Sequence, residues 1–182
     1  MKTINNYITE KLRINKSNFK KGAEHTLFPK NIDELSEMVG NEVFKNGNEC
    51  DLNHIDTSKI TDMNNLFYFS EFNGDISEWD VSNVTNMYQM FWKSEFNGDL
   101  SKWDVSSVEN MSGMFDKSNF NNDSICDWDV SNVTDMTEIF YNCNFNQDIS
   151  KWKINPKCKT KNMFWSSKIE DKYKPFQNGE RL

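Results

Sequence analysis

The sequence is poor in the residues on which most catalytic and metal centres depend. It has two histidines, four cysteines and seven glycines in 182 residues. The cysteines form no Cys-x-x-Cys pair, which excludes the usual zinc framework and indicates no disulfide scaffold. No glycine-rich phosphate-binding loop is present. We therefore expect no enzyme activity, no metal site and no cofactor.

Long apolar runs are also missing. No stretch approaches the ~20 apolar residues of a membrane-spanning helix. The N-terminal sequence MKTINNYITEKLRINK lacks the continuous apolar core of a secretory signal peptide. The sequence as written therefore predicts no transmembrane segment and a cytoplasmic location.

Positive charge is scarce in the middle of the chain. The net charge is -7, and residues 51–153 contain six lysines against eighteen acidic residues. Both chain ends are basic by comparison. An acidic central region argues against nucleic acid as the partner.

What the sequence does contain is a repeat. Phenylalanine, tryptophan and aspartate recur at a nearly constant spacing, and Ser124 is the single inserted residue. A fixed period in the twenties is typical of a solenoid. The tryptophans of the series are Trp79, Trp103, Trp128 and Trp152.

Each repeat combines two hydrophobic periods. The Trp-Asp-Val segment alternates apolar and polar residues, which indicates a very short strand with one buried face. Val84, Met87, Met90 and Phe91 follow the spacing of a helix of two to three turns. Asn-Gly at 73–74 and 97–98 predicts turns with positive φ. The expected fold is an α/β solenoid, a leucine-rich-repeat-like right-handed stack of about five strand, helix and turn units.

Two helices are expected before the repeats. Residues 3–14 form a short basic amphipathic pattern, and a polar linker continues to residue 28. This first helix is either a docking peptide or a packed cap. The second helix starts after Pro29, with Asn31 or Asp33 as its cap, and ends at Gly47. The predicted divisions are residues 1–28, an N-terminal cap at 29–50, the repeats at 51–165 and a C-terminal cap or tail at 166–182.

The repeat unit resembles those of the BspA-like leucine-rich-repeat surface proteins. The Trp-Asp-Val-Ser, Val-Thr-x-Met and Met-Phe elements recur in order over about residues 50–165. The resemblance implies a leucine-rich-repeat solenoid that binds proteins or host surfaces and has no catalytic residues. Many members of that family are exported or lipid-anchored, whereas this sequence shows neither a signal peptide nor a lipobox cysteine. The first residues, MKTINNYITEK, also resemble packaging peptides of internal head proteins from large tailed phages.

Two series of aspartates could carry chemistry. In the first, four carboxylates stack in adjacent repeats, so either the Asp-x-Ser turn provides backbone hydrogen bonds or the series binds a cation or a basic partner. In the second, turn stabilisation is favoured over calcium, because the ligands of a calcium loop are not clustered. The first series is Asp56, Asp80, Asp104 and Asp129, followed by Lys153; the second is Asp75, Asp99, Asp123 and Asp148.

The aromatic residues divide into two groups. The repeated tryptophans keep phase with valine and isoleucine, which favours core packing over a carbohydrate-binding platform. Four other aromatics break this phase and are predicted to be exposed contact residues on the helical face. They are Tyr88, Trp92, Tyr141 and Trp165.

Three function hypotheses follow. The first is a non-catalytic, monomeric module that binds a protein partner, preferably a basic one, through the acidic sheet face and the aromatic helical face. The alternative is a structural or cargo protein, of phage-related type, whose basic N-terminal helix directs its delivery. The third, an enzyme, would use Cys50 with His54, although a lone Cys-x-x-x-His is a weak signal for a nucleophile.

Overall fold

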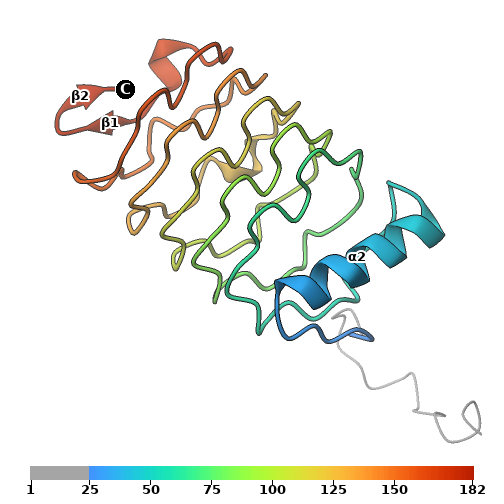
Figure 1. Cartoon of the computed structure of the whole chain (residues 1–182). Coiled ribbons are helices and arrows are strands. Elements are labelled where there is room, and N and C mark those ends of the chain that lie inside the picture. The colour runs from blue at the N-terminus through green and yellow to red at the C-terminus, as the bar shows by residue number, and fades with distance from the viewer. Residues whose placement is uncertain (1–24) are drawn as a thin grey trace, which may run out of the picture.

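Repeated turns of chain lie side by side in the computed structural model, between a helix at one end and a small hairpin at the other (Figure 1). The structure describes residues 25–182. The predicted helix at residues 3–14 lies outside this range. The named elements are α2 (Ile32–Asn46), the 3₁₀ helices η1 (Asp123–Ile125) and η2 (Asp171–Tyr173), and the strands β1 (Phe176–Gln177) and β2 (Glu180–Arg181).

Helix α2 forms where the sequence predicts a helix. The side chain of Asn31 accepts a hydrogen bond from the N–H of Glu34 at 2.9 Å, as expected of an N-cap. Gly47 ends the helix with a φ of 88°. Leu35 and Val39 are buried and belong to the same apolar core as the repeats. The helix therefore covers the apolar end of the first repeat.

The residues just before α2 also belong to the folded unit. Leu27 forms a parallel bridge with Ile55. The N–H of Asp56 donates to the carbonyl of Leu27 at 2.8 Å. Leu27 is thus paired with the first repeat, although it lies within residues 1–28, which the sequence assigns to the first helix and linker.

Adjacent repeats are joined by parallel backbone pairing. A row of isolated bridges runs along the stack, with one residue from each repeat. The predicted strand at Trp79–Val81 is not formed, and the pairing lies several residues later, in most repeats just before a buried methionine. The bridged residues are Asp62, Asn86, Asn110, Asp135 and Lys159.

The helix predicted over 84–91 is not formed either, because its N–H groups have partners in the next repeat. Met87, Gln89 and Phe91 donate to carbonyls of the following repeat, at 2.8, 3.0 and 2.9 Å. The alternate amides of Met90 and Trp92 donate to carbonyls within their own repeat, at 3.3 and 3.1 Å. Gln89 has a φ of 50°, which the interior of a right-handed helix does not allow. Overlapping turns replace the helix.

The apolar side chains nevertheless point inward as the sequence predicts. The rings of Phe67, Phe91 and Phe115 stack on one another with centroids 5.4 and 5.6 Å apart. Nearly all repeat positions of the phenylalanine, methionine and valine series are buried in one core. The core is thus a set of parallel columns along the stack.

The repeated tryptophans are buried and join neighbouring repeats. The indole N–H of Trp103 donates to the carbonyl of Ile76 in the preceding repeat at 3.1 Å. Trp79, Trp128 and Trp152 make the equivalent bond, at 3.0 to 3.3 Å. The core assignment is confirmed, which removes these rings from any carbohydrate-binding platform.

A second polar ladder runs along the turns. Side-chain oxygens of Asn73, Asn97, Asn121 and Asn146 each accept the backbone N–H of the residue one repeat later, at 2.8 to 3.0 Å. Each amide therefore fixes the register of its neighbour. This is a structural role for the asparagines of the repeat.

The Asn-Gly turns owe their glycines to close packing. Positive φ among the described glycines occurs at Gly47, Gly113 and Gly179, so the prediction of positive φ at 74 and 98 is wrong. A Cβ at Gly74 would overlap the carbonyl oxygen of Cys50 and lie 2.7 Å from the ring of Phe72. The missing side chain lets two backbone segments approach each other.

The C-terminal residues cover the last repeat. Strands β1 and β2 pair in an antiparallel hairpin, and Phe176 of β1 forms a parallel bridge with Lys153. The N–H of Ile149 donates to the carbonyl of Tyr173 in η2 at 3.1 Å. Backbone groups that would otherwise face solvent at this end are thereby paired.

The two glycines at 74 and 40 give opposite predictions for the same substitution. Gly74→Ala should lower the free energy of unfolding by about 1–3 kcal/mol, because the new methyl meets backbone. Gly40→Ala, in α2 with no atom within 4 Å of the new Cβ, should raise it by up to ~1 kcal/mol. Urea unfolding of both variants tests this, and equal effects would contradict the packing explanation.

Candidate functional site

Four aspartates, which we call the acidic column, lie in register along the stack. They occupy the position between the buried tryptophan and valine of a repeat, or between Ile55 and Thr57 in the first, and three of them are exposed while Asp56 is half-buried. One oxygen of each carboxylate accepts the N–H of the serine two residues later, at 3.0 to 3.1 Å. The members are Asp56, Asp80, Asp104 and Asp129.

These turn hydrogen bonds stabilise the charged form of the column. Bonds from Ser106 hold the pKa of Asp104 below its ordinary value, and those from Ser131 do the same for Asp129. The neighbouring charge of Asp129 opposes the shift at Asp104. The turn role of the column is therefore supported, and the bonds favour the ionised form of Asp104 and Asp129.

The column next to it contains charges of both signs. Glu78 and Lys102 form an ion pair between adjacent repeats. Both side chains are about half exposed, so the pair contributes little to stability. Among the described residues, by contrast, Asp80, Asp104 and Asp129 form no ion pair.

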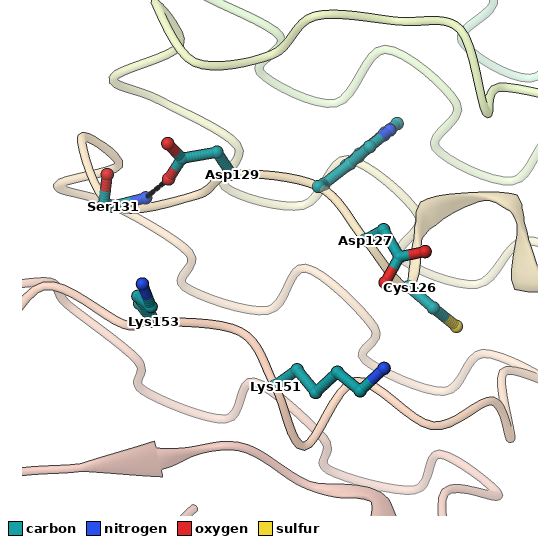
Figure 2. Close-up of a pocket in the computed structure, with 7 residues that line it drawn as sticks. Cys126, Asp127, Asp129, Ser131, Lys151 and Lys153 are labelled. Atoms are coloured by element: carbon teal, nitrogen blue, oxygen red, sulfur yellow. Dashed lines mark hydrogen bonds between the residues drawn. The ribbon is translucent and has the colours of Figure 1, made fainter.

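A pocket of about 340 Å³ lies at the C-terminal end of the acidic column. In Figure 2 its labelled side chains fall into two groups, with Asp129, Ser131 and Lys153 at one end and Cys126, Asp127 and Lys151 at the other. Two lysines offset two aspartates here, so the lining carries no net charge.

Aromatic side chains form a second surface, on the part of each repeat that follows the bridged residues. At one position in successive repeats, the backbone carbonyl accepts an N–H from the preceding repeat at 2.7 to 2.9 Å. These bonds keep the side chains at that position in register along the stack. The rings of Tyr68 and Trp92 stack with centroids 4.5 Å apart and an interplanar angle of 9°. We call this series the aromatic column: Tyr68, Trp92, Asp116, Tyr141 and Trp165.

Two lysines lie over these rings. The ammonium of Lys93 is 4.7 Å from the ring centre of Trp92, and that of Lys117 is 5.4 Å from it. Lys117 is also 5.3 Å from the ring centre of Tyr141. Cation–π contacts of this kind hold the aromatic rings in place and add positive charge to the surface.

The predicted contact residues are accessible to different degrees. Trp165 is 63% exposed and Tyr88 39%, whereas Trp92 and Tyr141 are half-buried. Sequence reasoning missed the exposed Tyr68 and Phe69, because the first repeat departs from the consensus. It also missed Asp116 and Lys117. The signal was available, since Tyr68 and Asp116 each stand one repeat away from Trp92.

The second aspartate series caps turns, as the sequence favours. Asp75, Asp99 and Asp148 accept the N–H of the serine two residues later, at 2.8 to 3.0 Å. In the fourth repeat Asn122 takes this role and accepts from Ser124 at 2.9 Å. In the repeat with the inserted residue, Asp123 therefore does not accept the turn hydrogen bond that the sequence predicts for it.

The cysteines have the properties of packing residues. Burial raises the pKa of all four thiols, to about 11 for Cys126 and Cys158. His54 lies 3.6 Å from a carboxylate oxygen of Glu42. No hydrogen bond joins it to Cys50 in the described part of the chain, so the geometry gives no support to a Cys50–His54 nucleophile.

Two further features are absent from residues 25–182. No group of three or more histidine, cysteine, aspartate or glutamate residues is placed to hold a metal ion. No helix there is both long and apolar enough to span a membrane.

Comparison with known families places the chain. Residues 33–141 and 94–175 match the family described as "Mycoplasma protein of unknown function, DUF285". Together these matches extend over more than half of the sequence, so the chain belongs to this family. No curated protein and no solved structure matches it.

The turn role of the acidic column predicts a difference between two substitutions. Asp104→Ala should lower the free energy of unfolding by about 0.5–1.5 kcal/mol, because the N–H of Ser106 loses its acceptor. Asp104→Asn should change it by less than ~0.5 kcal/mol. An amide oxygen can cap the same turn, as Asn122 does. Urea unfolding distinguishes the two, and an equally large loss in both variants would assign the stability to the charge.

The raised thiol pKa predicts slow alkylation of Cys126. A pKa of about 11 leaves the thiolate at roughly 0.1% at pH 8, against roughly a quarter for an ordinary cysteine. Its reaction with iodoacetamide should therefore be about two orders of magnitude slower than in the urea-unfolded chain. The rate should rise about tenfold per pH unit up to pH ~10. Peptide mass spectrometry reads each cysteine separately, and a fast reaction at Cys50 alone would favour the enzyme hypothesis.

Proposed function

We propose that this member of the DUF285 family is a non-catalytic protein-binding module with a leucine-rich-repeat-like solenoid of the BspA-like type. The acidic column is one contact surface, and the aromatic column with the exposed Phe69 and Tyr88 is the other. A protein partner with a basic region would complement the first, and apolar or planar side chains would pack on the second. The chain itself acts as a monomer with no cofactor.

The exposed aromatic residues carry this proposal. Almost every other large apolar side chain of the repeats is buried, whereas Tyr68, Phe69, Tyr88 and Trp165 are 39 to 67% exposed. Exposed aromatic residues on one surface are typical anchors of protein interfaces.

The acidic column supports the proposal through its charge. Three carboxylates follow one another in adjacent repeats, with turn bonds but without an ion pair among the described residues. Like charges at such close spacing are unfavourable in the free protein. A basic partner surface would relieve that repulsion and accelerate association.

Shared backbone bonding supports a rigid presentation of both surfaces. Each repeat donates N–H groups to the next, and both columns follow this register. A preorganised surface loses little conformational entropy on binding. The alternative, delivery by a basic N-terminal helix, depends on residues outside the described range.

The proposal predicts that capture of a partner depends on both contact surfaces. Immobilised full-length protein should retain a specific protein from an extract of the producing organism. Tyr88→Ala combined with Trp165→Ala should weaken this retention roughly tenfold or more, because interface aromatics dominate binding. Asp80→Asn, Asp104→Asn and Asp129→Asn together should weaken it mainly at low salt.

A charge-matched variant controls for nonspecific electrostatics. Asp75→Asn, Asp99→Asn and Asp148→Asn together remove the same charge from the turn face and also keep their turn bonds. This variant should bind as the unmodified protein does. Retention that survives changes in both contact surfaces, or that falls equally in the control, would refute the proposed surfaces.

A further inference from the structure

Asp116 interrupts the aromatic column and is buried there. It is 4% exposed and stands between the aromatic positions of the repeats before and after it. One oxygen, Oδ2, accepts the indole N–H of Trp92 at 2.7 Å. The other, Oδ1, is buried and has no hydrogen-bond partner among the described residues. A buried carboxylate that uses half of its acceptor capacity is unfavourable.

A cation already lies beside this carboxylate. The ammonium of Lys117 is 3.6 Å from Oδ2 of Asp116, which is longer than a hydrogen bond. The same ammonium lies over the rings of Trp92 and Tyr141, at 5.4 and 5.3 Å. Burial raises the pKa of Asp116 in spite of the bonds from Trp92 and the charge of Lys117. Lys117 therefore compensates the carboxylate incompletely.

The space above the side chain of Asp116, between the repeats of Trp92 and Tyr141, has the thickness of one repeat. Trp92 and Tyr141 are two repeats apart, or about 10 Å at the usual spacing of paired parallel segments. An aspartate side chain is much shorter than a tryptophan or tyrosine, and the ammonium of Lys117 lies over both rings, 5.4 and 5.3 Å from their centres. We call the space that this ammonium occupies the slot. A planar group already stacks on Trp92 from the first repeat, where Tyr68 lies 4.5 Å away.

These features together fit a planar cation. A guanidinium stacks on aromatic rings and presents a fork of N–H donors that matches the two oxygens of a carboxylate. An ammonium has neither the plane nor the fork. The side chain of Lys117 is 37% exposed, so it can leave the slot without disturbing the core.

We propose that the slot formed by Trp92, Asp116 and Tyr141 binds an arginine side chain of the protein partner, which displaces Lys117. This inference rests on the proposed function and names the partner's chemistry at one point of the aromatic column. The guanidinium donates to the free oxygen of Asp116 and stacks between the two rings. Lys117 acts as a weak internal substitute that favours the charged carboxylate in the free protein.

The test is a titration of the full-length protein with N-acetyl-arginine-methylamide. The indole ¹⁵N–¹H resonance of Trp92 reports directly on the site, because this N–H is bonded to Asp116. It should shift with millimolar affinity, as expected for a single side chain. The buried indoles of the core tryptophans should not shift. The neutral isostere N-acetyl-citrulline-methylamide should produce no shift.

Substitutions then distinguish arginine binding in the slot from a general effect of surface charge. Lys117→Met keeps the aliphatic stem but removes the competing ammonium, and should tighten arginine binding roughly five- to tenfold. Lys93→Met, which removes an ammonium over Trp92 and Phe69 that forms no ion pair with Asp116 among the described residues, should leave it within roughly twofold. Asp116→Asn keeps an acceptor for the indole of Trp92 and should abolish binding.

Three outcomes would refute the proposal that the slot binds an arginine side chain. They are an equal response to citrulline, an unchanged affinity in Lys117→Met, and unchanged binding in Asp116→Asn. Each is independent of partner capture. A slot that fails while capture still depends on Tyr88 and Trp165 would leave the proposed function intact.

Discussion

Backbone hydrogen bonds between adjacent repeats are the constraint on which this structure depends. Met87 and Phe91 donate to carbonyls of the following repeat, so a single repeat cannot satisfy its own amides. The unit becomes stable only in a stack, and the stack needs an end at which pairing and apolar surface stop. Leu35 of α2 covers the first end, and the β1–β2 hairpin pairs with Lys153 at the other.

The same constraint explains how much of the fold could be predicted. The fixed repeat period identifies the core columns, because burial repeats with the sequence even where secondary structure is irregular. Phe91 and Trp103 are buried as expected. Helix α2 was predictable from local signals alone, since Asn31 and Gly47 cap it with the side chain and the φ angle those residues favour.

The path of the backbone between core residues could not be predicted. Met87, Met90 and Phe91 have helical spacing, yet a chain of overlapping turns also directs them inward. Which path forms is decided by the neighbouring repeat, whose carbonyls accept the amides that a helix would use itself. Gly74 illustrates the same limit. A glycine is needed there because the backbone of Cys50, which belongs to another segment, approaches it closely.

The number of acids in the sequence was likewise a poor guide to which acids matter for binding. Asp80 and Asp104 attract attention by repetition, but their own turns stabilise them, so their contribution to a partner is long-range charge. Asp116 occurs once in its column and owes its burial to the rings around it, which no local pattern reveals. An incompletely bonded carboxylate in a desolvated aromatic setting gains more from a correctly placed cation than an exposed one. Specificity of the proposed module should therefore come from the irregular position, and its association rate from the regular ones.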